Sequence, residues 1–159
     1  MKKILITGAA GFIGLALVKK IKKFYQLDLL DDFSRGKYDF EFQEIIKDKN
    51  ITLIRHDLSR KLKIDCQYDY IFHLASIVGV DNVISKPTDV LIKNFKFIEN
   101  ILEFSKKQKK LKKLFFFSTS EVYAGSILSN LIKFPTPETQ VLTLPDLTDR
   151  RSTYLLSKI

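Results

Sequence analysis

The sequence predicts an α/β fold in which helices cover both faces of a parallel β-sheet. Three observations support this prediction: short apolar runs alternate with amphipathic helical patterns, a glycine-rich turn joins the first run to the first helix, and an acidic residue follows the second run. The 159 residues suit a single domain with a sizeable core.

Five apolar runs are expected to form strands and three periodic segments to form helices. The strands are predicted near residues 3–7, 26–30, 51–54, 69–74 and 114–118. The helices are predicted over 11–23, around 40–47 and over about 87–108, the last one opened by a proline in its first turn. Residues 125–150 carry prolines among polar side chains and are expected to form a long functional loop.

The first predicted strand runs directly into a turn with the spacing G-x-x-G-x-x-G, at Gly8, Gly11 and Gly14. Such glycines permit a tight turn, leave room for a phosphate and let the helix lie close to the strand. The free N–H groups at the helix start, where Phe12 and Ile13 stand, can then hold a pyrophosphate. The helix is expected to bury an apolar face made of Phe12, Ile13, Leu15, Leu17, Val18 and Ile21. The arrangement predicts a Rossmann-type dinucleotide site; the alternative is a glycine turn that binds nothing.

An acidic residue stands where a dinucleotide site needs one. Asp31 ends the second predicted strand, about 20 residues after the glycines, where its carboxylate can accept both hydroxyls of the adenine ribose. Asp31 and Asp32 would repel a 2′-phosphate, which favours NAD over NADP, although Arg35 and Lys37 keep NADP open. The alternative is an acidic loop without a ligand.

A second motif lies near residue 158. Tyr154 and Lys158 are four residues apart, so on a helix they share one face and the ammonium can lower the pKa of the phenol from about 10, leaving a general base. The Thr119 hydroxyl is expected to donate a hydrogen bond to the same substrate oxygen that the Tyr154 phenolate contacts. Glu121 is a further candidate base, with a solvated or helix-capping carboxylate as its alternative. The motif alone also describes an ordinary surface tyrosine and lysine.

Composition narrows the remaining classes of function. The net charge of +9 comes from lysines spread along helix faces, with one dense run at 106–113 that ends a predicted helix, so no nucleic-acid partner is expected, whereas an anionic nucleotide-sugar would benefit. One cysteine excludes a disulfide framework, and there is no metal cluster, signal peptide or membrane span. A soluble, cytoplasmic protein is expected.

Together these motifs resemble the extended short-chain dehydrogenase/reductases that act on nucleotide-sugars, namely epimerases, 4,6-dehydratases and decarboxylases. The matching segments are TGAAGFIG (7–14), LLDDFSRG (29–36), HDL (56–58), FHLAS (72–76), STSEVY (118–123) and RSTYLLSK (151–158). The resemblance implies NAD as the cofactor. It also implies that Asp57 contacts the adenine amino group and Leu58 supports the ring. By the same resemblance, the residues that pass under or near the cofactor are Leu74, Ala75, Ser76 and Asn94.

The resemblance further implies a transient oxidation. Tyr154 removes the proton of a sugar C4 hydroxyl, Thr119 hydrogen-bonds that oxygen, and the hydride passes to NAD. Lys158 keeps Tyr154 ionised and holds the nicotinamide ribose. Dehydratases of this kind place an acid where Ser120 stands, so the Thr-Ser-Glu order is closer to decarboxylases and some epimerases.

By the same resemblance, residues 1–159 are expected to be an incomplete NAD(P)-binding Rossmann domain that lacks a C-terminal substrate domain. A helix that ended just after Lys158 is expected to fray. The chain is then either the NAD-binding portion of an enzyme, with little turnover alone, or a non-catalytic NAD-binding module. Its expected partners are a nucleotide-sugar and either a second copy, contacted through residues 87–108, or a missing half supplied in trans.

Overall fold

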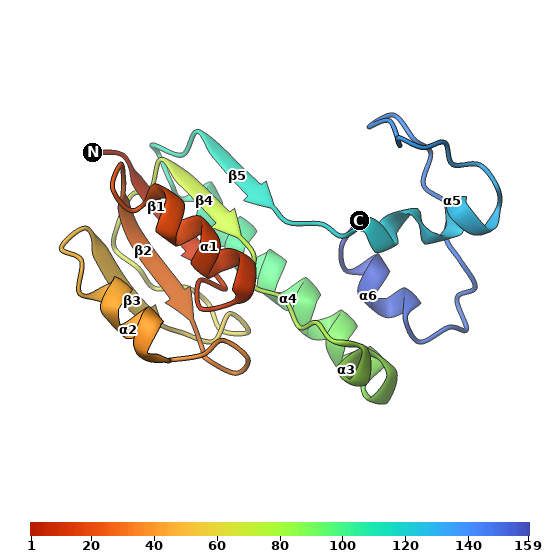
Figure 1. Ribbon diagram of the computed structural model, residues 1–159, viewed down its shortest axis with the longest axis horizontal. Helices are drawn as coiled ribbons and strands as arrows, with labels where there is room; N and C mark the ends of the chain where they lie inside the picture. Colours follow the sequence, from red (N-terminus) through yellow and green to blue (C-terminus); the bar gives the residue numbers. More distant parts are fainter. The chain divides into compact units, whose positions relative to one another are not determined.

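A computed structural model describes all 159 residues and confirms the α/β fold (Figure 1). The single sheet has the order β3-β2-β1-β4-β5, and every neighbouring pair is parallel. The strands are β1 (Lys3–Thr7), β2 (Gln26–Asp31), β3 (Ile51–Arg55), β4 (Tyr70–His73) and β5 (Lys113–Phe116). Each predicted strand is present, with small shifts at its ends.

The chain divides into two compact units. The first unit comprises Met1–Ser76 and Lys96–Phe117, and the second comprises Ile77–Phe95 and Ser118–Ile159. The long helix α4 (Pro87–Lys106) contributes residues to both units. Each unit is described separately below.

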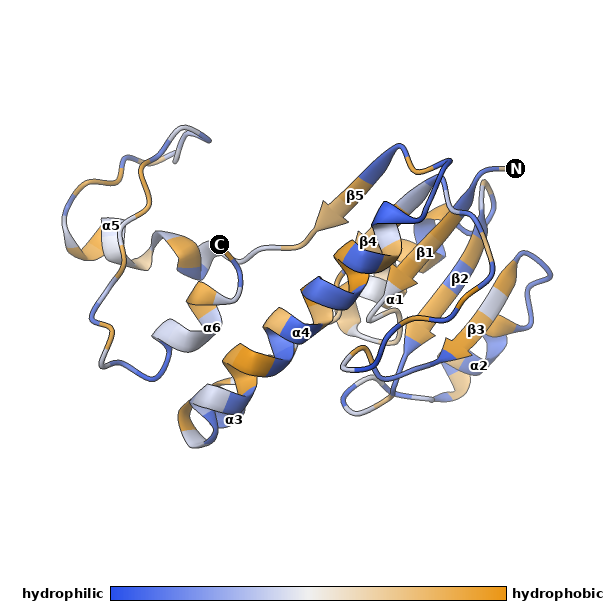
Figure 2. Ribbon diagram, turned by 180° about the vertical axis from the view of Figure 1, so that it is seen from behind, coloured by the Kyte–Doolittle hydropathy of each residue, from blue (hydrophilic) through white to orange (hydrophobic).

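The first unit contains the whole sheet. Helices α1 (Phe12–Ile21) and α2 (Phe40–Ile46) lie on one face, and residues 96–106 of α4 lie on the other, as Figures 1 and 2 show. Because both faces are covered, the strands are almost continuously apolar. The buried cluster on one side includes Ile4, Ile6, Val18, Leu27, Leu29, Phe42 and Ile45.

The start of α1 corrects one expectation. Phe12 and Ile13 were expected on the buried face, but they are 93% and 58% exposed. The buried face is set by Gly14 and Val18, which are four residues apart. At 100° per residue, side chains one and two positions before Gly14 point away from that face. An apolar side chain in the first helical turn is therefore a poor guide to burial here.

The second unit contains short elements that the sequence pattern does not predict. They are α3 (Val80–Ser85), the 3-10 helix η1 (Ser120–Tyr123) and α5 (Ala124–Leu128); the Tyr154 motif begins on α6 (Ser152–Leu156). The expected loop over 125–150 therefore begins as a helix. It folds back onto that helix, since the Ser126 hydroxyl donates to the Val141 carbonyl at 2.7 Å and accepts from the Thr143 N–H at 3.2 Å.

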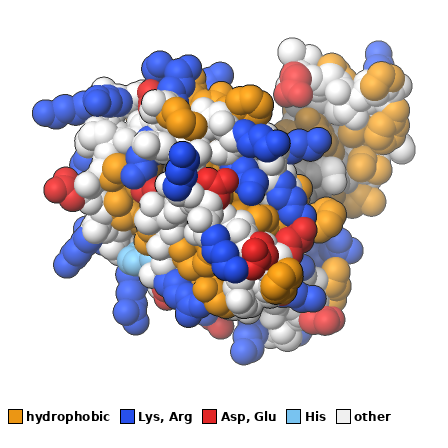
Figure 3. All heavy atoms as spheres, turned by 60° about the vertical axis from the view of Figure 1, so that its left-hand side comes forward, with side chains coloured by type: hydrophobic (Ala, Val, Ile, Leu, Met, Phe, Trp, Pro, Cys, Tyr) orange, Lys and Arg blue, Asp and Glu red, His pale blue; other side chains and the backbone are white.

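Charged side chains of both signs are interspersed on the face drawn in Figure 3. Figure 3 shows Lys and Arg side chains scattered over the face in view, with acidic and uncharged side chains between them. The dense run at 106–113 begins at the last residue of α4, and its lysines are exposed. None of the helices combines the length and apolar character needed to cross a membrane.

Candidate functional site

The glycine turn between β1 and α1 requires glycine at two positions. Gly8 has φ +70°, and a Cβ there would lie 2.7 Å from the Ala75 amide nitrogen. A Cβ on Gly14 would lie 2.2 Å from the Gly8 carbonyl oxygen. Gly11 has extended backbone directly before α1 and offers no side-chain cap, so the first N–H groups of the helix remain open for an anion.

Asp31 connects the turn to the loop that follows β2. Its carboxylate accepts hydrogen bonds from the Ala10 and Phe33 N–H groups, each at 2.9 Å. Burial raises the pKa of this carboxyl, against the lowering effect of those hydrogen bonds. A carboxylate has about four acceptor positions, so Asp31 keeps capacity to accept from a ribose hydroxyl. Asp32 differs, because it is exposed and accepts from the Ser34 N–H and hydroxyl in a local turn.

Arg55 is a cation near this region that the motifs do not single out. It ends β3 and pairs in register with Asp31. Its guanidinium lies 4.9 Å from the ring centre of Phe33 and 4.7 Å from that of Tyr38. Arg55 therefore supports the loop after β2 through cation–π contacts. Its alignment with the acidic strand end was visible only once the register of β2 and β3 was known.

The segment after β3 is held to α4. The Asp57 carboxylate accepts from the Ser59 N–H at 2.8 Å and from its hydroxyl at 2.7 Å, and the hydroxyl bond in particular holds the pKa of Asp57 below its usual value. Leu58 is buried, and its carbonyl accepts from the Asn100 side chain at 2.7 Å. These contacts fix the backbone of the expected adenine-contacting residues.

The segment after β4 lies against the glycine turn. The Leu74 N–H donates to the Thr7 carbonyl at 3.2 Å, and the Ala75 N–H donates to the Thr7 hydroxyl at 3.3 Å. Ala75 is also the residue that a Cβ on Gly8 would meet. Ser76, partly buried, is the last residue of the first segment of this unit. The first unit thus brings the glycine turn together with the strand ends expected to surround the cofactor.

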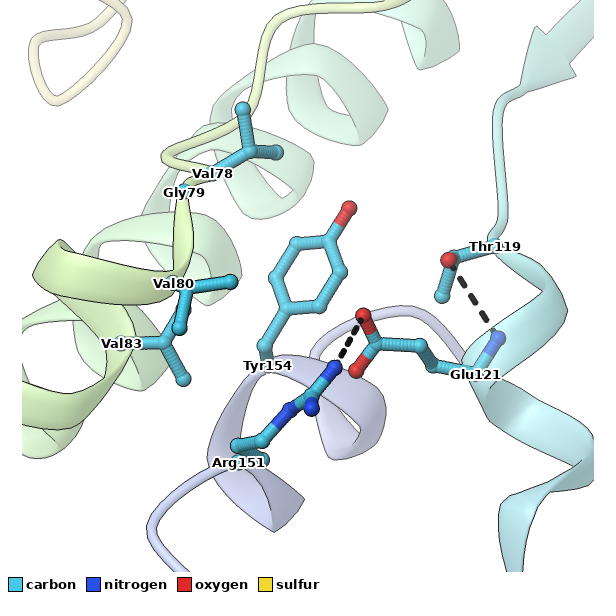
Figure 4. A pocket seen from close by; sticks show the side chains of 8 residues that line it. All are labelled: Val78, Gly79, Val80, Val83, Thr119, Glu121, Arg151 and Tyr154. Atoms are coloured by element: carbon cyan, nitrogen blue, oxygen red, sulfur yellow. Dashed lines mark hydrogen bonds and ion pairs between the residues drawn. The ribbon is translucent and has the colours of Figure 1, made fainter.

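The second unit brings three of the predicted catalytic side chains into one pocket. Thr119, Glu121 and Tyr154 line a pocket of about 180 Å³ (Figure 4). Val78, Gly79, Val80, Val83 and Arg151 complete its lining. In Figure 4 the Tyr154 phenol points into the space between the valine segment and Thr119. Such a pocket, smaller than the roughly 300–1,000 Å³ of sites that enclose a whole ligand, suits one ring of a larger molecule.

The side chains of Thr119 and Glu121, at the start of η1, are held differently. Thr119 precedes η1, and its hydroxyl oxygen accepts from the Glu121 N–H at 3.4 Å, so the capping role belongs to Thr119. The Glu121 carboxylate accepts from the Arg151 guanidinium at 3.3 Å. Arg151 was not predicted as a site residue. It lies three residues before Tyr154, a spacing that places two side chains on neighbouring positions of a helix surface and that could have indicated it.

Lys158 does not lie on the same helix as Tyr154. Helix α6 ends at Leu156, where the Ser157 hydroxyl donates to the Tyr154 carbonyl at 2.7 Å and the Lys158 N–H donates to the Leu155 carbonyl at 2.9 Å. The Ser157 N–H is shared between the Thr153 and Tyr154 carbonyls, so the helix gives way here to three-residue turns. Lys158 is buried and is not among the residues that line the pocket. Burial lowers the pKa of its ammonium to about 8.

Asn94 is a buried bridge within the second unit. Its side-chain oxygen accepts from the Ile77 N–H at 2.8 Å, and its amide group donates to the Ile77 carbonyl at 3.2 Å and to the Ser157 hydroxyl at 3.1 Å. Asn94 therefore ties α4 both to the segment that leads into the pocket and to the turn after α6.

Comparison with known proteins identifies the family. The model of the "NAD dependent epimerase/dehydratase family" matches residues 4–159. The chain is 36% identical over 123 residues to UDP-N-acetyl-alpha-D-glucosaminuronate decarboxylase of Bacillus cytotoxicus, covering 77% of this chain and 38% of that protein. It is 35% identical over 123 residues to UDP-glucuronic acid decarboxylase 1 of Danio rerio, covering 77% and 28%.

A solved structure agrees with these sequence relatives. The crystal structure of a UDP-galactose 4-epimerase superposes with a TM-score of 0.76 at 27% identity, covering 98% of this chain and 48% of that one. This chain thus spans less than half the length of the proteins it matches. The matches confirm the predicted Rossmann-type fold, the resemblance and the cofactor of the family, NAD. The chain belongs to the NAD-dependent epimerase/dehydratase family.

Proposed function

We propose that residues 1–159 form the NAD-binding portion of an enzyme that transiently oxidises the C4 hydroxyl of a nucleotide-sugar. The observation that carries this proposal is the meeting of the Tyr154 phenol, the Thr119 hydroxyl and the Glu121 carboxylate in one pocket. A base, a hydrogen-bond donor and a second carboxylate are the groups that such an oxidation and the following proton transfer require. The glycine turn and Asp31 supply the cofactor side of the proposal.

Each side chain has a role in the proposed reaction. Tyr154 accepts the proton of the C4 hydroxyl, and Thr119 donates a hydrogen bond to the same oxygen. NAD, which the glycine turn and Asp31 would hold, would supply the hydride acceptor for C4. Lys158 supports the ionised phenol, and its pKa of about 8 means that its charge is kept near neutral pH. Glu121 is the group available for proton transfer to or from the 4-keto sugar.

The favoured substrates within this class are nucleotide-linked uronic acids. Both sequence relatives described above are named as decarboxylases of such sugars. The Thr119-Ser120-Glu121 order agrees with this, because Ser120 is a poor proton donor for the loss of a C6 hydroxyl. A decarboxylase or an epimerase is therefore favoured over a 4,6-dehydratase.

The test is sugar-dependent reduction of the nicotinamide. The chain is mixed with NAD and UDP-glucuronate, the absorbance of reduced nicotinamide is followed, and the sugar products are analysed. We expect reduction that falls by about 10²- to 10⁴-fold in Tyr154→Phe, the range that general acid–base groups contribute. The matched control is Tyr123→Phe, since Tyr123 ends η1 and does not line the pocket.

Two outcomes would contradict the proposal. NAD binding without any sugar-dependent absorbance change would favour the alternative, a non-catalytic NAD-binding module. Equal reduction in wild type and Tyr154→Phe would remove Tyr154 from the reaction.

A further inference from the structure

The pocket of the second unit holds one pair of opposite charges. Among its lining residues only Glu121 and Arg151 are charged, and Arg151 Nη2 lies 3.3 Å from Glu121 Oε1 (Figure 4). Their side chains are 36% and 53% exposed. An ion pair this accessible to water contributes only about 0–1 kcal/mol. The guanidinium can therefore exchange Glu121 for another carboxylate at little cost.

Arg151 has the capacity for a second partner. A guanidinium carries five N–H donors in a planar fork, and here one hydrogen bond goes to Glu121. The fork matches a carboxylate through two parallel hydrogen bonds, which is why arginine is common where carboxylates are recognised. Its backbone is held in place, because the Arg151 N–H donates to the Asp149 carboxylate at 2.9 Å directly before α6.

The neighbouring side chains determine which carboxylate would reach the guanidinium. Tyr154 and Thr119 are proposed to hold the C4 oxygen of the sugar, and both line the same pocket as Arg151. In a uronic acid the carboxylate is attached to C5, the ring atom next to C4. Val78, Val80 and Val83 offer an apolar wall for the ring. Arg151 is the one cationic side chain that lines this pocket, so it is the group there that a sugar carboxylate can meet.

We propose that Arg151 is a specificity-determining residue that binds the sugar carboxylate of a uronic acid nucleotide, and that Glu121 holds the guanidinium in position until that carboxylate replaces it. This inference rests on the proposed function. Replacement leaves the Glu121 carboxylate released beside the bound sugar, where it can accept a proton. Arg151 thus links recognition of the substrate to the availability of Glu121.

The experiment compares UDP-glucuronate with UDP-glucose, which differ in the carboxylate. Dissociation constants are measured by calorimetry on the full chain with saturating NAD. We expect the wild type to prefer UDP-glucuronate by about ten- to a hundredfold, the range for hydrogen bonds to a charged group. Arg151→Gln is expected to lose this preference while keeping its affinity for UDP-glucose. Arg151→Lys is expected to keep part of it, because the charge remains and the fork does not.

Two further variants sharpen the comparison. Arg150→Gln is the matched control, since Arg150 donates to the Ile84 carbonyl at 2.9 Å and does not line the pocket; its preference should equal that of the wild type. Glu121→Gln should bind UDP-glucuronate more tightly than the wild type, because the competing carboxylate is gone. Circular dichroism of each variant verifies folding.

The outcomes separate this inference from the proposed function. A preference that persists in Arg151→Gln, or an equal loss of affinity for both sugars, overturns the role of Arg151. Equal binding of the two sugars by the wild type overturns the inference alone. If NAD binds but neither nucleotide-sugar does, the proposed function fails and the inference fails with it.

Discussion

Asp31 shows how one carboxylate can serve both the fold and the cofactor. Its two oxygens hold Ala10 in the glycine turn and Phe33 in the following loop. Asp31→Asn keeps the shape but removes the charge and one acceptor. We expect NAD affinity to fall by about tenfold or more, since hydrogen bonds to a charged group contribute about 1.5–3 kcal/mol, and the discrimination against NADP to shrink. Calorimetric titration with both cofactors measures this.

Asp32→Asn is the control for that prediction. Asp32 is exposed and its hydrogen bonds stay within a local turn, so its loss of charge should change NAD affinity only slightly. An equal effect of the two substitutions would mean that the general negative potential of the loop, and not a specific contact from Asp31, selects the cofactor.

Lys158 should make stability depend on pH. Below pH 8 the folded and unfolded states both carry its charge, so the cost of burying that charge is fully present. Between about 8 and the ordinary value of 10.5 the folded state has released the proton while the unfolded state keeps it, so the free energy of unfolding rises with pH. The rise is roughly 3 kcal/mol at most. Denaturant titrations followed by circular dichroism should show it.

Lys158→Met should remove this rise and be more stable than the wild type at pH 7, because the buried charge is gone. Lys110→Met is the matched control, since Lys110 is exposed, and it should follow the wild-type pH profile. If Lys158→Met shows the same dependence of the free energy of unfolding on pH as the wild type, groups other than Lys158 cause it.

At the scale of elements, two glycines at the junction of β1 and α1 should affect different properties: Gly14 the stability of the fold, and Gly11 the binding of NAD. In Gly14→Ala the new Cβ would lie 2.2 Å from the Gly8 carbonyl oxygen, so backbone must move; we expect about 1–3 kcal/mol of destabilisation or more. In Gly11→Ala the new Cβ would lie 3.2 Å from the Gly8 carbonyl oxygen, a tight contact that needs a smaller shift, so the loss of stability should be smaller than in Gly14→Ala while NAD affinity falls, because Gly11 directly precedes the open helix start. Paired denaturation and NAD titrations distinguish the two effects; similar destabilisation by both would contradict this division.

Asn94 should stabilise the turn after α6. Asn94→Ala removes the hydrogen bonds to Ile77 and Ser157 and leaves the Ile77 N–H without that partner, so we expect a loss of about 2–4 kcal/mol within the second unit. Amide hydrogen exchange should accelerate at Ile77 and over 152–157. Asn82→Ala is the control, because Asn82 lies exposed on α3 and donates to the Val78 carbonyl at 3.3 Å. Faster exchange only in the first unit would contradict the bridging role.

The elements differ in how far local sequence determines them. The strands were predicted because a sheet covered on both faces requires continuous apolar runs, which are visible in any short window. Helix α5 was not, because its five residues have no periodicity of their own. It is stabilised by Val141 and Thr143, which lie 15 and 17 residues from their partner Ser126. Contacts of that kind exist only after the chain has folded.

At the scale of the whole molecule, the two parts of the candidate site also differ in how far the sequence predicts them. The glycines and Asp31 were predicted from their spacing beside regular strands, whereas the other cofactor residues were implied only by the family resemblance. The pairing of Glu121 with Arg151 joins residues 30 positions apart through an irregular segment, and neither residue type suggests the other. The predicted placement of Tyr154 and Lys158 on one helix face was wrong for a related reason. Helix α6 ends at Leu156, and the Ser157 hydroxyl donates to the Tyr154 carbonyl there.

The net charge of +9 is a property of the whole molecule, and it allows a test of whether the protein binds nucleic acid. Because the lysines are dispersed, duplex DNA should meet only a few at a time, so retention should vanish as salt rises, with a log–log slope weaker than about −3. Substituting Lys109 and Lys110 by Gln should leave the free energy of unfolding and NAD affinity unchanged, since both are exposed. A slope near −6 or steeper, reduced by the double substitution, would instead indicate an ordered set of phosphate contacts around residues 106–113.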